Sequence, residues 1–335
     1  MSTASVVPET WELTGDDARR VLRDASVRRV VADAAMRFRW SDGFSHSRAL
    51  AFQLVLSFIP GVLVLVGFAA LTHNTALSRT IIGTIVALVP GPAGDVFKQA
   101  ANQGAGAVSG HGNLAALITG AVAMTISSTT AFGQIERGAN RIYGVEKDRP
   151  ALRKYTRAAA LALSVGLLLA MAFILLAAGR AVTSSLHSGL SRTVWVVGRW
   201  PLGAVLLAVA YASVFKLSPK RRQPALSWLL VGALVAVVLN VVSSVVLSVY
   251  LNLSGSFGDT YGPLAGFLGV MLWAYLVSIG LYLGLAFAAQ LEAVRAGKSA
   301  PQSEAKVAST EPASTTATDD TAGSTADRHT MAVTR

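Results

Sequence analysis

The segment LSWLLVGALVAVVLNVVSSVVLSVY, from Leu226 to Tyr250, contains 25 consecutive residues and no charged side chain. A helix rises about 1.5 Å per residue, so about 20 apolar residues are needed to cross the ~30 Å hydrocarbon core of a bilayer. An uncharged run of this length is typical of a transmembrane helix. The segment therefore predicts an all-α membrane protein.

Five further apolar runs precede or follow this segment. They are Ala49–Leu71, Leu114–Ile135, Ala158–Gly179, Trp200–Leu217 and Pro263–Gln290. Trp200–Leu217 is the shortest, but the long side chains of Arg199 and Lys216 at its edges can reach the lipid headgroups. We therefore expect six transmembrane helices in a polytopic domain that comprises residues 48–292.

Segments rich in positive charge alternate with segments poor in it along the chain. Eight Lys or Arg residues precede the first span, seven lie in residues 136–157 and four in residues 216–225, and the other connections hold few. Cytoplasmic loops of membrane proteins carry an excess of Lys and Arg. The pattern places both termini in the cytoplasm, and six spans is the even number that this requires.

The formal net charge of +11 resides mainly in these short segments. Basic residues in such positions orient a membrane protein and attract anionic lipids. A nucleic-acid-binding surface would instead gather them on one folded domain. We therefore expect membrane lipids as partners and no nucleic acid.

The N-terminal segment, residues 1–47, contains apolar residues at helical spacing. These are Val27, Val30, Val31, Ala34, Ala35 and Phe38, with Arg28, Arg29, Asp33 and Arg37 predicted on other faces. The spacing predicts an amphipathic helix that lies on the cytoplasmic leaflet. The alternative is a helix that packs on the cytoplasmic loops. Thr14, with Asp17 three residues later, predicts a helix cap.

Two further segments complete the predicted architecture. TIIGTIVALV, Thr80–Val89, is apolar but too short to cross a bilayer, and it stops at Pro90. It predicts an outer interfacial or re-entrant segment. Residues 293–335 are dominated by Ser, Thr, Ala and Asp, a composition that predicts a disordered cytoplasmic tail.

No set of residues in the sequence is typical of an enzyme. There are no cysteines, and the five histidines have no metal-ligand spacing. We therefore predict no catalytic activity, no metal and no cofactor. The span cores also lack buried carboxylates, which disfavours a proton-coupled transporter.

Neutral polar and small residues occupy the spans instead. Gln53, Ser127, Ser128 and Asn240 are candidates either for bonds between neighbouring helices or for a shared polar cavity. Gly280 and Gly284 are four residues apart, a spacing that lets helices approach closely. This spacing favours packing within the chain, and a homo-oligomer is the alternative.

The stretch SSTTAFGQIERGANRIYGV, Ser127–Val145, predicts that the second span continues as a helix into the cytoplasm. Three interpretations of its polar end are open. The charges can serve topology and attraction to anionic lipid. Alternatively, Glu136, Asn140 and Arg141 bind a phosphate or carboxylate headgroup beside Ser127 and Ser128, because the arginine fork suits such groups. In the third interpretation Arg141 bonds loop carbonyls and locks the cytoplasmic helix ends together.

Three blocks of the sequence resemble the YihY/BrkB family of bacterial inner-membrane proteins. They are HSRALAFQLVLSFIPG (His46–Gly61), SSTTAFGQIERGANRIYGV, and YGPLAGFLGVMLWAYLVSIGLYLG (Tyr261–Gly284). The likeness covers roughly residues 28–292. Where family members often carry Gly-Ala-Glu near the end of the last span, this chain has Gly284-Leu285-Ala286.

The resemblance implies six helices with cytoplasmic termini in the bacterial plasma (inner) membrane. It further implies a cell-envelope protein that binds or transports an amphiphilic, anionic, lipid-like substrate. The candidate site for this substrate comprises Glu136, Asn140, Arg141, Ser127, Ser128, Gln53 and Asn240. The alternative function is a non-catalytic membrane scaffold that supports envelope integrity. The family was formerly labelled ribonuclease BN, but the sequence has no nuclease-like acid set and disfavours that activity.

Overall fold

The computed structural model describes residues 3–71, 113–177, 189–253 and 264–303, with residues 83, 98–99 and 261 between them. Six long helices, of 27 to 31 residues each, dominate these ranges. They are α3 (Gly43–Leu71), α6 (Asn113–Ile142), α7 (Ala151–Ala177), α9 (Gly189–Leu217), α10 (Leu226–Leu253) and α12 (Ala265–Arg295). Two shorter helices, α1 (Gly15–Asp24) and α2 (Val27–Trp40), precede them. The described residues form no strand, so the all-α class is confirmed.

Three of the helices have the length and hydropathy of a membrane span. Within the described part of the chain these are α9, α10 and α12. The other three predicted spans coincide with α3, α6 and α7, whose side chains are described only in part. The count of six spans stays a prediction, and the predicted re-entrant segment Thr80–Val89 lies outside the described residues.

The helix α9 begins earlier than predicted, at Gly189 rather than at Trp200. The prediction placed the boundary at Arg199 because a charge marks the edge of an apolar run. Helix formation does not stop at an arginine, since arginine is a good helix former. Pro201 lies inside the helix and does not begin it.

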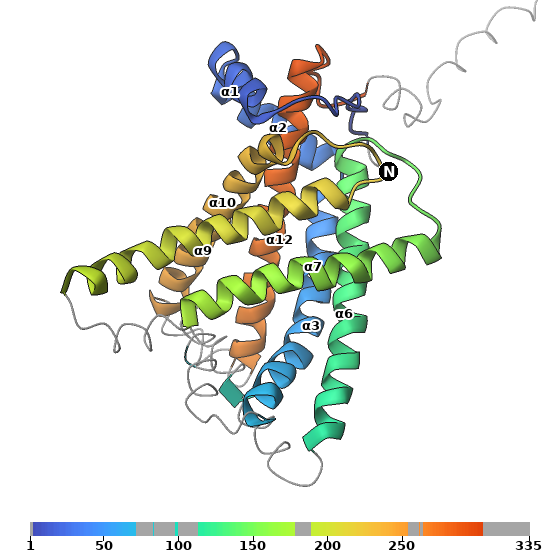
Figure 1. Cartoon of the computed structure of the whole chain (residues 1–335). Coiled ribbons are helices and arrows are strands. Elements are labelled where there is room, and N and C mark those ends of the chain that lie inside the picture. The colour runs from blue at the N-terminus through green and yellow to red at the C-terminus, as the bar shows by residue number, and fades with distance from the viewer. Residues whose placement is uncertain are drawn as a thin grey trace, which may run out of the picture. The chain divides into compact units, whose positions relative to one another are not determined.

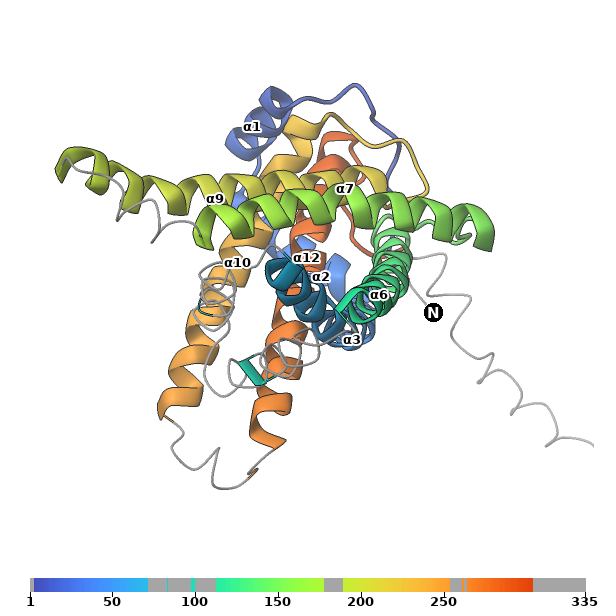
Figure 2. The ribbon, with the colours of Figure 1, turned by 60° about the horizontal axis from the view of Figure 1, so that its bottom comes forward.

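The long helices pack in a connected bundle around α12. Helix α12 contacts α2, α3, α6 and α10; α3 also packs on α6, and α9 packs on α10. Helices α7 and α9 lie side by side across the other helices (Figures 1 and 2). The C-terminal half of α12 is almost completely buried, from Gly284 to Ala293.

Glycines bring α12 close to its neighbours. A Cβ on Gly284 would lie 2.6 Å from the Ala236 Cβ and 2.6 Å from the Gly232 carbonyl oxygen, so α10 and α12 are in backbone contact. The space beside Gly280 is filled by the side chain of Asn240. The Gly280–Gly284 pair therefore packs within the chain.

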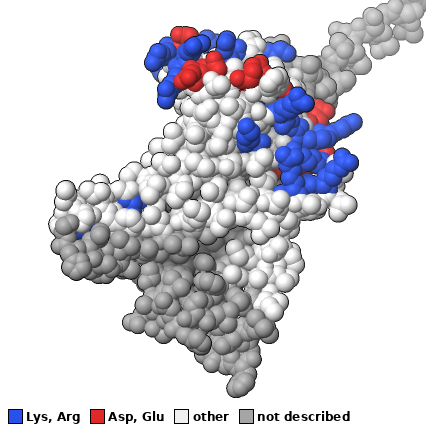
Figure 3. Space-filling model, viewed as in Figure 1, with Lys and Arg blue, Asp and Glu red and all other residues white. Residues whose placement is uncertain are grey.

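Charged side chains gather at one end of the described molecule. Figure 3 shows Lys, Arg, Asp and Glu over α1 and over the connection between α6 and α7, above a body that is largely uncharged on this face. The body exposes large apolar side chains, such as Leu163 (72%) on α7 and Val245 (57%) on α10. Apolar residues so exposed on long helices are typical of a surface that faces lipid.

Candidate functional site

The polar end of α6 is helical, as predicted, up to Ile142. The chain then turns at Gly144, whose φ of 73° suits glycine. The backbone N–H of Val145 donates to the Asn140 carbonyl at 2.8 Å and closes this turn. The turn sends residues 145–150 back along the bundle to the start of α7.

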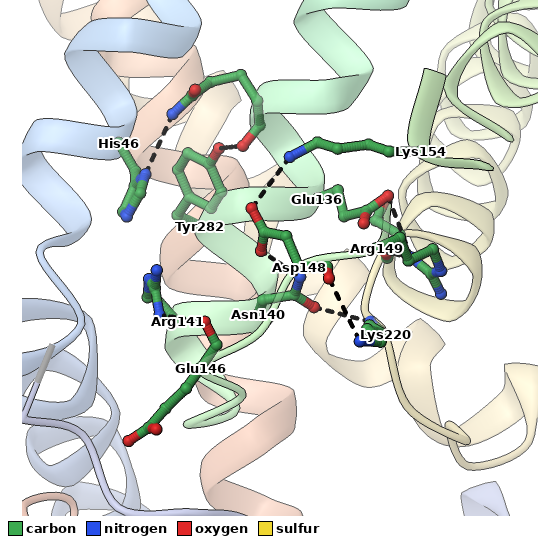
Figure 4. Close-up of polar contacts among 12 residues, drawn as sticks. His46, Glu136, Asn140, Arg141, Glu146, Asp148, Arg149, Lys154, Lys220 and Tyr282 are labelled. Carbon is green, nitrogen blue, oxygen red and sulfur yellow. Dashed lines mark hydrogen bonds and ion pairs between the residues drawn. The ribbon is translucent and has the colours of Figure 1, made fainter. Parts of the chain in front are cut away.

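Asn140 connects this returning segment to a second connection of the chain. Its side chain is fully buried; Nδ2 donates to Asp148 at 2.8 Å, and Oδ1 accepts the backbone N–H of Lys220 at 2.7 Å. Lys154 forms a 3.1 Å ion pair with the other oxygen of Asp148. Figure 4 shows Asp148 between Asn140 and Lys154.

Arg149 makes a second link between the same two connections. It forms a 3.1 Å ion pair with Glu136, with side chains 12% and 4% exposed. It also donates to the carbonyls of Ser218 (2.8 Å) and Pro219 (2.7 Å). We call the set Glu136, Asn140, Asp148, Arg149, Lys154 and Lys220 the loop clasp, because it ties the α6–α7 connection to the α9–α10 connection.

The loop clasp also lowers the pKa of Asp148. Partial burial raises the pKa of this carboxyl, but the hydrogen bonds from Asn140 and Lys154 outweigh it. The net pKa lies below the ordinary value of 3.8. Asp148 is therefore ionised at neutral pH.

The structure distributes the predicted site residues over three places. Glu136, Asn140 and Arg141 share one helix end, and Arg141 donates to the Glu146 carbonyl at 3.0 Å (Figure 4). This contact agrees with the interpretation in which Arg141 bonds loop carbonyls.

The neutral candidates lie away from this helix end, nearer the middle of their helices. Thr130 donates to Gln53 of α3 at 2.8 Å and to the Ser127 carbonyl at 2.7 Å. Ser127 and Ser128 are half-buried on the same helix. Asn240 instead donates to Tyr211 of α9 at 2.6 Å. The bonds of Gln53 and Asn240 join neighbouring helices, and the two side chains have different partners.

A second buried polar cluster was missed by the sequence analysis. Arg221 and Glu292 form a 2.6 Å ion pair with side chains 2% and 0% exposed. Thr10 donates to the same Glu292 oxygen from its hydroxyl (2.6 Å) and its backbone N–H (3.2 Å). The guanidinium of Arg221 lies 4.4 Å from the centre of the Tyr143 ring. In the sequence, Arg221 was one of several loop cations, and Glu292 lay beyond the last predicted span.

Arg37 requires a correction, because it was predicted on a polar face of its helix. Its side chain is 0% exposed. It donates to Gln290 Oε1 (2.8 Å), to the carbonyls of Ser5 (2.9 Å) and Ile142 (3.3 Å), and to the Ser5 hydroxyl (3.0 Å). Burial lowers the pKa of Arg37 to about 10, which leaves it protonated at neutral pH. Periodicity missed this position because the guanidinium finds all its acceptors on other segments.

Helix α2 packs on α12 and α3, whereas the alternative interpretation placed it on the cytoplasmic loops. Val30, Ala34 and Phe38 are buried, and the helix contacts α12. Val27 and Val31 are each 51% exposed and extend the apolar face beyond this contact. Contact of this remaining face with a lipid leaflet stays a prediction.

The prediction of a disordered tail from residue 293 is wrong for its first residues. Helix α12 continues to Arg295, and the Gln290 side chain donates to the Ser299 carbonyl at 2.6 Å. The Ser5 N–H donates to the Pro301 carbonyl at 3.1 Å. Composition missed this segment because its order comes from backbone bonds to the N-terminus. Residues 304–335 lie outside the described residues.

Four basic side chains remain exposed beside the loop clasp. Arg137, Lys147, Arg153 and Arg157 are exposed and form no ion pair within the described part of the chain. Leu152 (83%) and Tyr155 (41%) are exposed between them at the start of α7. We call these six residues the basic corner; it lies in the region where Figure 3 shows Lys and Arg gathered over the α6–α7 connection.

Residues 34–309 match the family described as virulence factor BrkB. The chain belongs to the BrkB family. No curated protein and no solved structure matches it. The BrkB match runs from within α2 past the end of α12, and it confirms the resemblance carried by the three sequence blocks.

BrkB membership and the apolar helices together identify a membrane protein. In this BrkB protein, Ala286 is fully buried at the position where the resemblance places the glutamate of other family members. The buried carboxylate of α12 is Glu292, about two helical turns later.

Proposed function

We propose that the chain is a six-span protein of the bacterial plasma membrane, with both termini in the cytoplasm, that binds anionic amphiphiles at the basic corner. The observation that carries the proposal is the set of four exposed cations around Leu152 and Tyr155. Cations next to exposed apolar and aromatic side chains suit the boundary between headgroups and acyl chains. The arginine forks suit phosphate.

We propose the basic corner as the binding surface in place of the site at Glu136, Asn140 and Arg141 that we expected from the sequence. Asn140 and Glu136 are occupied by the loop clasp, and Arg141 donates to the Glu146 carbonyl. Each Lys or Arg near an anionic surface contributes ~1 kcal/mol. Substitution of Arg153 and Arg157 should therefore cost ~2 kcal/mol, which is roughly 30-fold in affinity.

The test uses the full chain in nanodiscs of phosphatidylcholine that contain a small fraction of pyrene-labelled phosphatidylglycerol or pyrene-labelled phosphatidylcholine. Tryptophan-to-pyrene energy transfer measures the enrichment of each lipid at the protein. We expect selectivity for the anionic probe that falls roughly 30-fold in Arg153→Gln/Arg157→Gln. Arg19→Gln/Arg20→Gln removes the same charge from exposed positions of α1 and should retain selectivity. Equal enrichment of both lipids would refute the proposal.

The loop clasp favours a second candidate function, a non-transporting scaffold. Transport through the α6 helix end would require the bonds from Asn140 to Asp148 and from Arg149 to the Ser218 carbonyl to open. Proteoliposomes with fluorescent anionic and zwitterionic lipids would distinguish the two functions. Protein-dependent movement of the anionic lipid would support transport, and binding without movement would support the scaffold. We propose no catalytic role.

A further inference from the structure

The N-terminal residues 3–13, here called the strap, are bonded to three parts of the charged end. The Val7 N–H donates to the Tyr143 carbonyl at 3.2 Å, and Thr10 donates to Glu292. The strap also accepts from two buried arginines: Pro8 accepts from Arg221 (2.9 Å), and Ser5 accepts from Arg37. Val7 (3% exposed) and Leu13 (7%) are its apolar anchors.

The cluster beneath the strap contains more positive than negative charge. Arg37 and Arg221 are both buried, and Glu292 is ion-paired with Arg221. All four hydrogen bonds of Arg37 go to neutral acceptors. Asp33, one turn earlier on α2, is half-buried and acts on Arg37 only through space, since the two side chains share no hydrogen bond. The three buried groups therefore carry one net positive charge, which a single monoanionic group would neutralise.

Two polar atoms of the ion pair make no hydrogen bond within the described residues. They are Nη1 of Arg221, a donor, and Oε2 of Glu292, an acceptor, and both are buried. Buried polar groups without partners are costly, so such atoms are candidates for contact with a ligand. A ligand that meets both needs an acceptor for Nη1 and a donor for Oε2, and the net positive charge of the cluster favours an anionic acceptor with an uncharged donor such as a hydroxyl. Phosphodiesters with a polyol headgroup have both.

We propose that the strap occupies an anion site formed by Arg37 and Arg221, and that a hydroxyl-bearing phosphodiester binds there when the strap leaves. The phosphate lies between the two guanidinium groups, takes the place of the Ser5 and Pro8 carbonyls, and also accepts from Nη1 of Arg221. The hydroxyl donates to Oε2 of Glu292, beside the Oε1 that accepts from Thr10 while the strap is bound. This site shares no residue with the basic corner, so it goes beyond the proposed lipid contacts there.

The proposal predicts that ligand binding exposes the strap, which a single cysteine can report. The chain has no cysteine, so Val7→Cys places one thiol at a buried position. The rate of maleimide labelling then measures the open fraction. Dioctanoyl phosphatidylglycerol at about ten times its dissociation constant should speed labelling about tenfold, because binding to the open state pulls the equilibrium. Dioctanoyl phosphatidylcholine should leave the rate unchanged.

The source of the phosphodiester is identified by a third probe, glycerophosphoglycerol, which is the headgroup without acyl chains. Acceleration by this probe identifies a soluble ligand, and acceleration only by the lipid identifies a membrane lipid. Leu13→Cys, at the other apolar anchor, is the second reporter and guards against a local effect at Val7.

Matched variants separate the site from general loosening. In the Val7→Cys background, Arg37→Gln should abolish the response to phosphatidylglycerol, and Arg37→Lys, which keeps the charge, should retain part of it. Arg28→Gln, exposed on the same helix, should respond fully. Arg153→Gln/Arg157→Gln should also respond fully, so failure at the basic corner and failure here are distinguishable. Labelling that ignores the anionic probe in both reporters, or a response that survives Arg37→Gln, would overturn the proposal.

Discussion

Arg221 and Glu292 lie 71 positions apart in the chain and form a 2.6 Å ion pair that is almost completely removed from solvent. The desolvation of two charges offsets much of their attraction, so such a pair adds little net stability. Its loss is costly, because the remaining charge is buried without a partner. The pair therefore specifies how the α9–α10 connection, α12 and the strap fit together.

Glu292→Gln should destabilise the protein by about 3–5 kcal/mol, because it leaves Arg221 buried and unpaired. Thermal unfolding in detergent, followed by circular dichroism, measures the change. Asp16→Asn, which breaks the exposed Arg19–Asp16 pair, is the matched control and should cost less than about 1 kcal/mol. Similar losses in the two variants would mean that the Arg221–Glu292 pair is not buried.

Asn140→Leu should weaken the loop clasp, because Asp148 and the Lys220 N–H lose their buried partner. Leaving buried polar groups unsatisfied costs about 1–3 kcal/mol each. Hydrogen exchange should show faster opening of both the 145–150 and the 217–225 segments. Faster exchange in only one of them would contradict the link between the two connections.

Gly284→Ala should destabilise the contact between α10 and α12 by about 1–3 kcal/mol, since the added methyl meets Ala236 and the Gly232 backbone. Gly166→Ala on α7 is the control, because nothing lies within 4 Å of its added Cβ. That change should stabilise the helix by up to about 1 kcal/mol through helix propensity. The unfolding midpoints of the two variants should therefore move in opposite directions.

Stability should fall in acid partly through Asp148. Its pKa in the folded protein lies below the ordinary value of 3.8, so the contribution of its ionised form is present above that value. The contribution is lost as the pH falls through the folded pKa. Asp148→Asn should therefore show a smaller decrease in unfolding midpoint between about pH 5 and pH 3 than the unchanged protein. An identical decrease would mean that Asp148 is not held ionised by Asn140 and Lys154.

The long helices could be predicted from sequence because a long uncharged run is by itself evidence for a helix in an apolar environment. The polar continuation of α6 to Ile142 and the Thr14–Asp17 cap could also be predicted, since both depend on residues close together in the chain. Asp17 accepts hydrogen bonds from the Thr14 hydroxyl and backbone N–H, both at 3.0 Å. The family was readable from three blocks.

Which charged residues form ion pairs could not be predicted from the sequence. The sequence does not distinguish the cations of residues 136–157. Arg149 and Lys154 nevertheless form ion pairs in the loop clasp, while Arg153 and Arg157 are exposed. Likewise, nothing near Thr10 in the sequence indicates a bond to Glu292, 282 positions away. Such choices depend on which connections meet in space, and local periodicity contains no information about that.

The most direct test of the proposed topology determines on which side of the membrane the charged end with the loop clasp lies. Single cysteines at Leu152, Leu190 and Leu253, each at least 78% exposed, can be labelled in spheroplasts with a membrane-impermeant maleimide. The six-span arrangement predicts that Leu190→Cys and Leu253→Cys react in intact spheroplasts, and that Leu152→Cys reacts only after permeabilisation. Reaction of Leu152→Cys in intact spheroplasts, or opposite sidedness of positions 190 and 253, would contradict it.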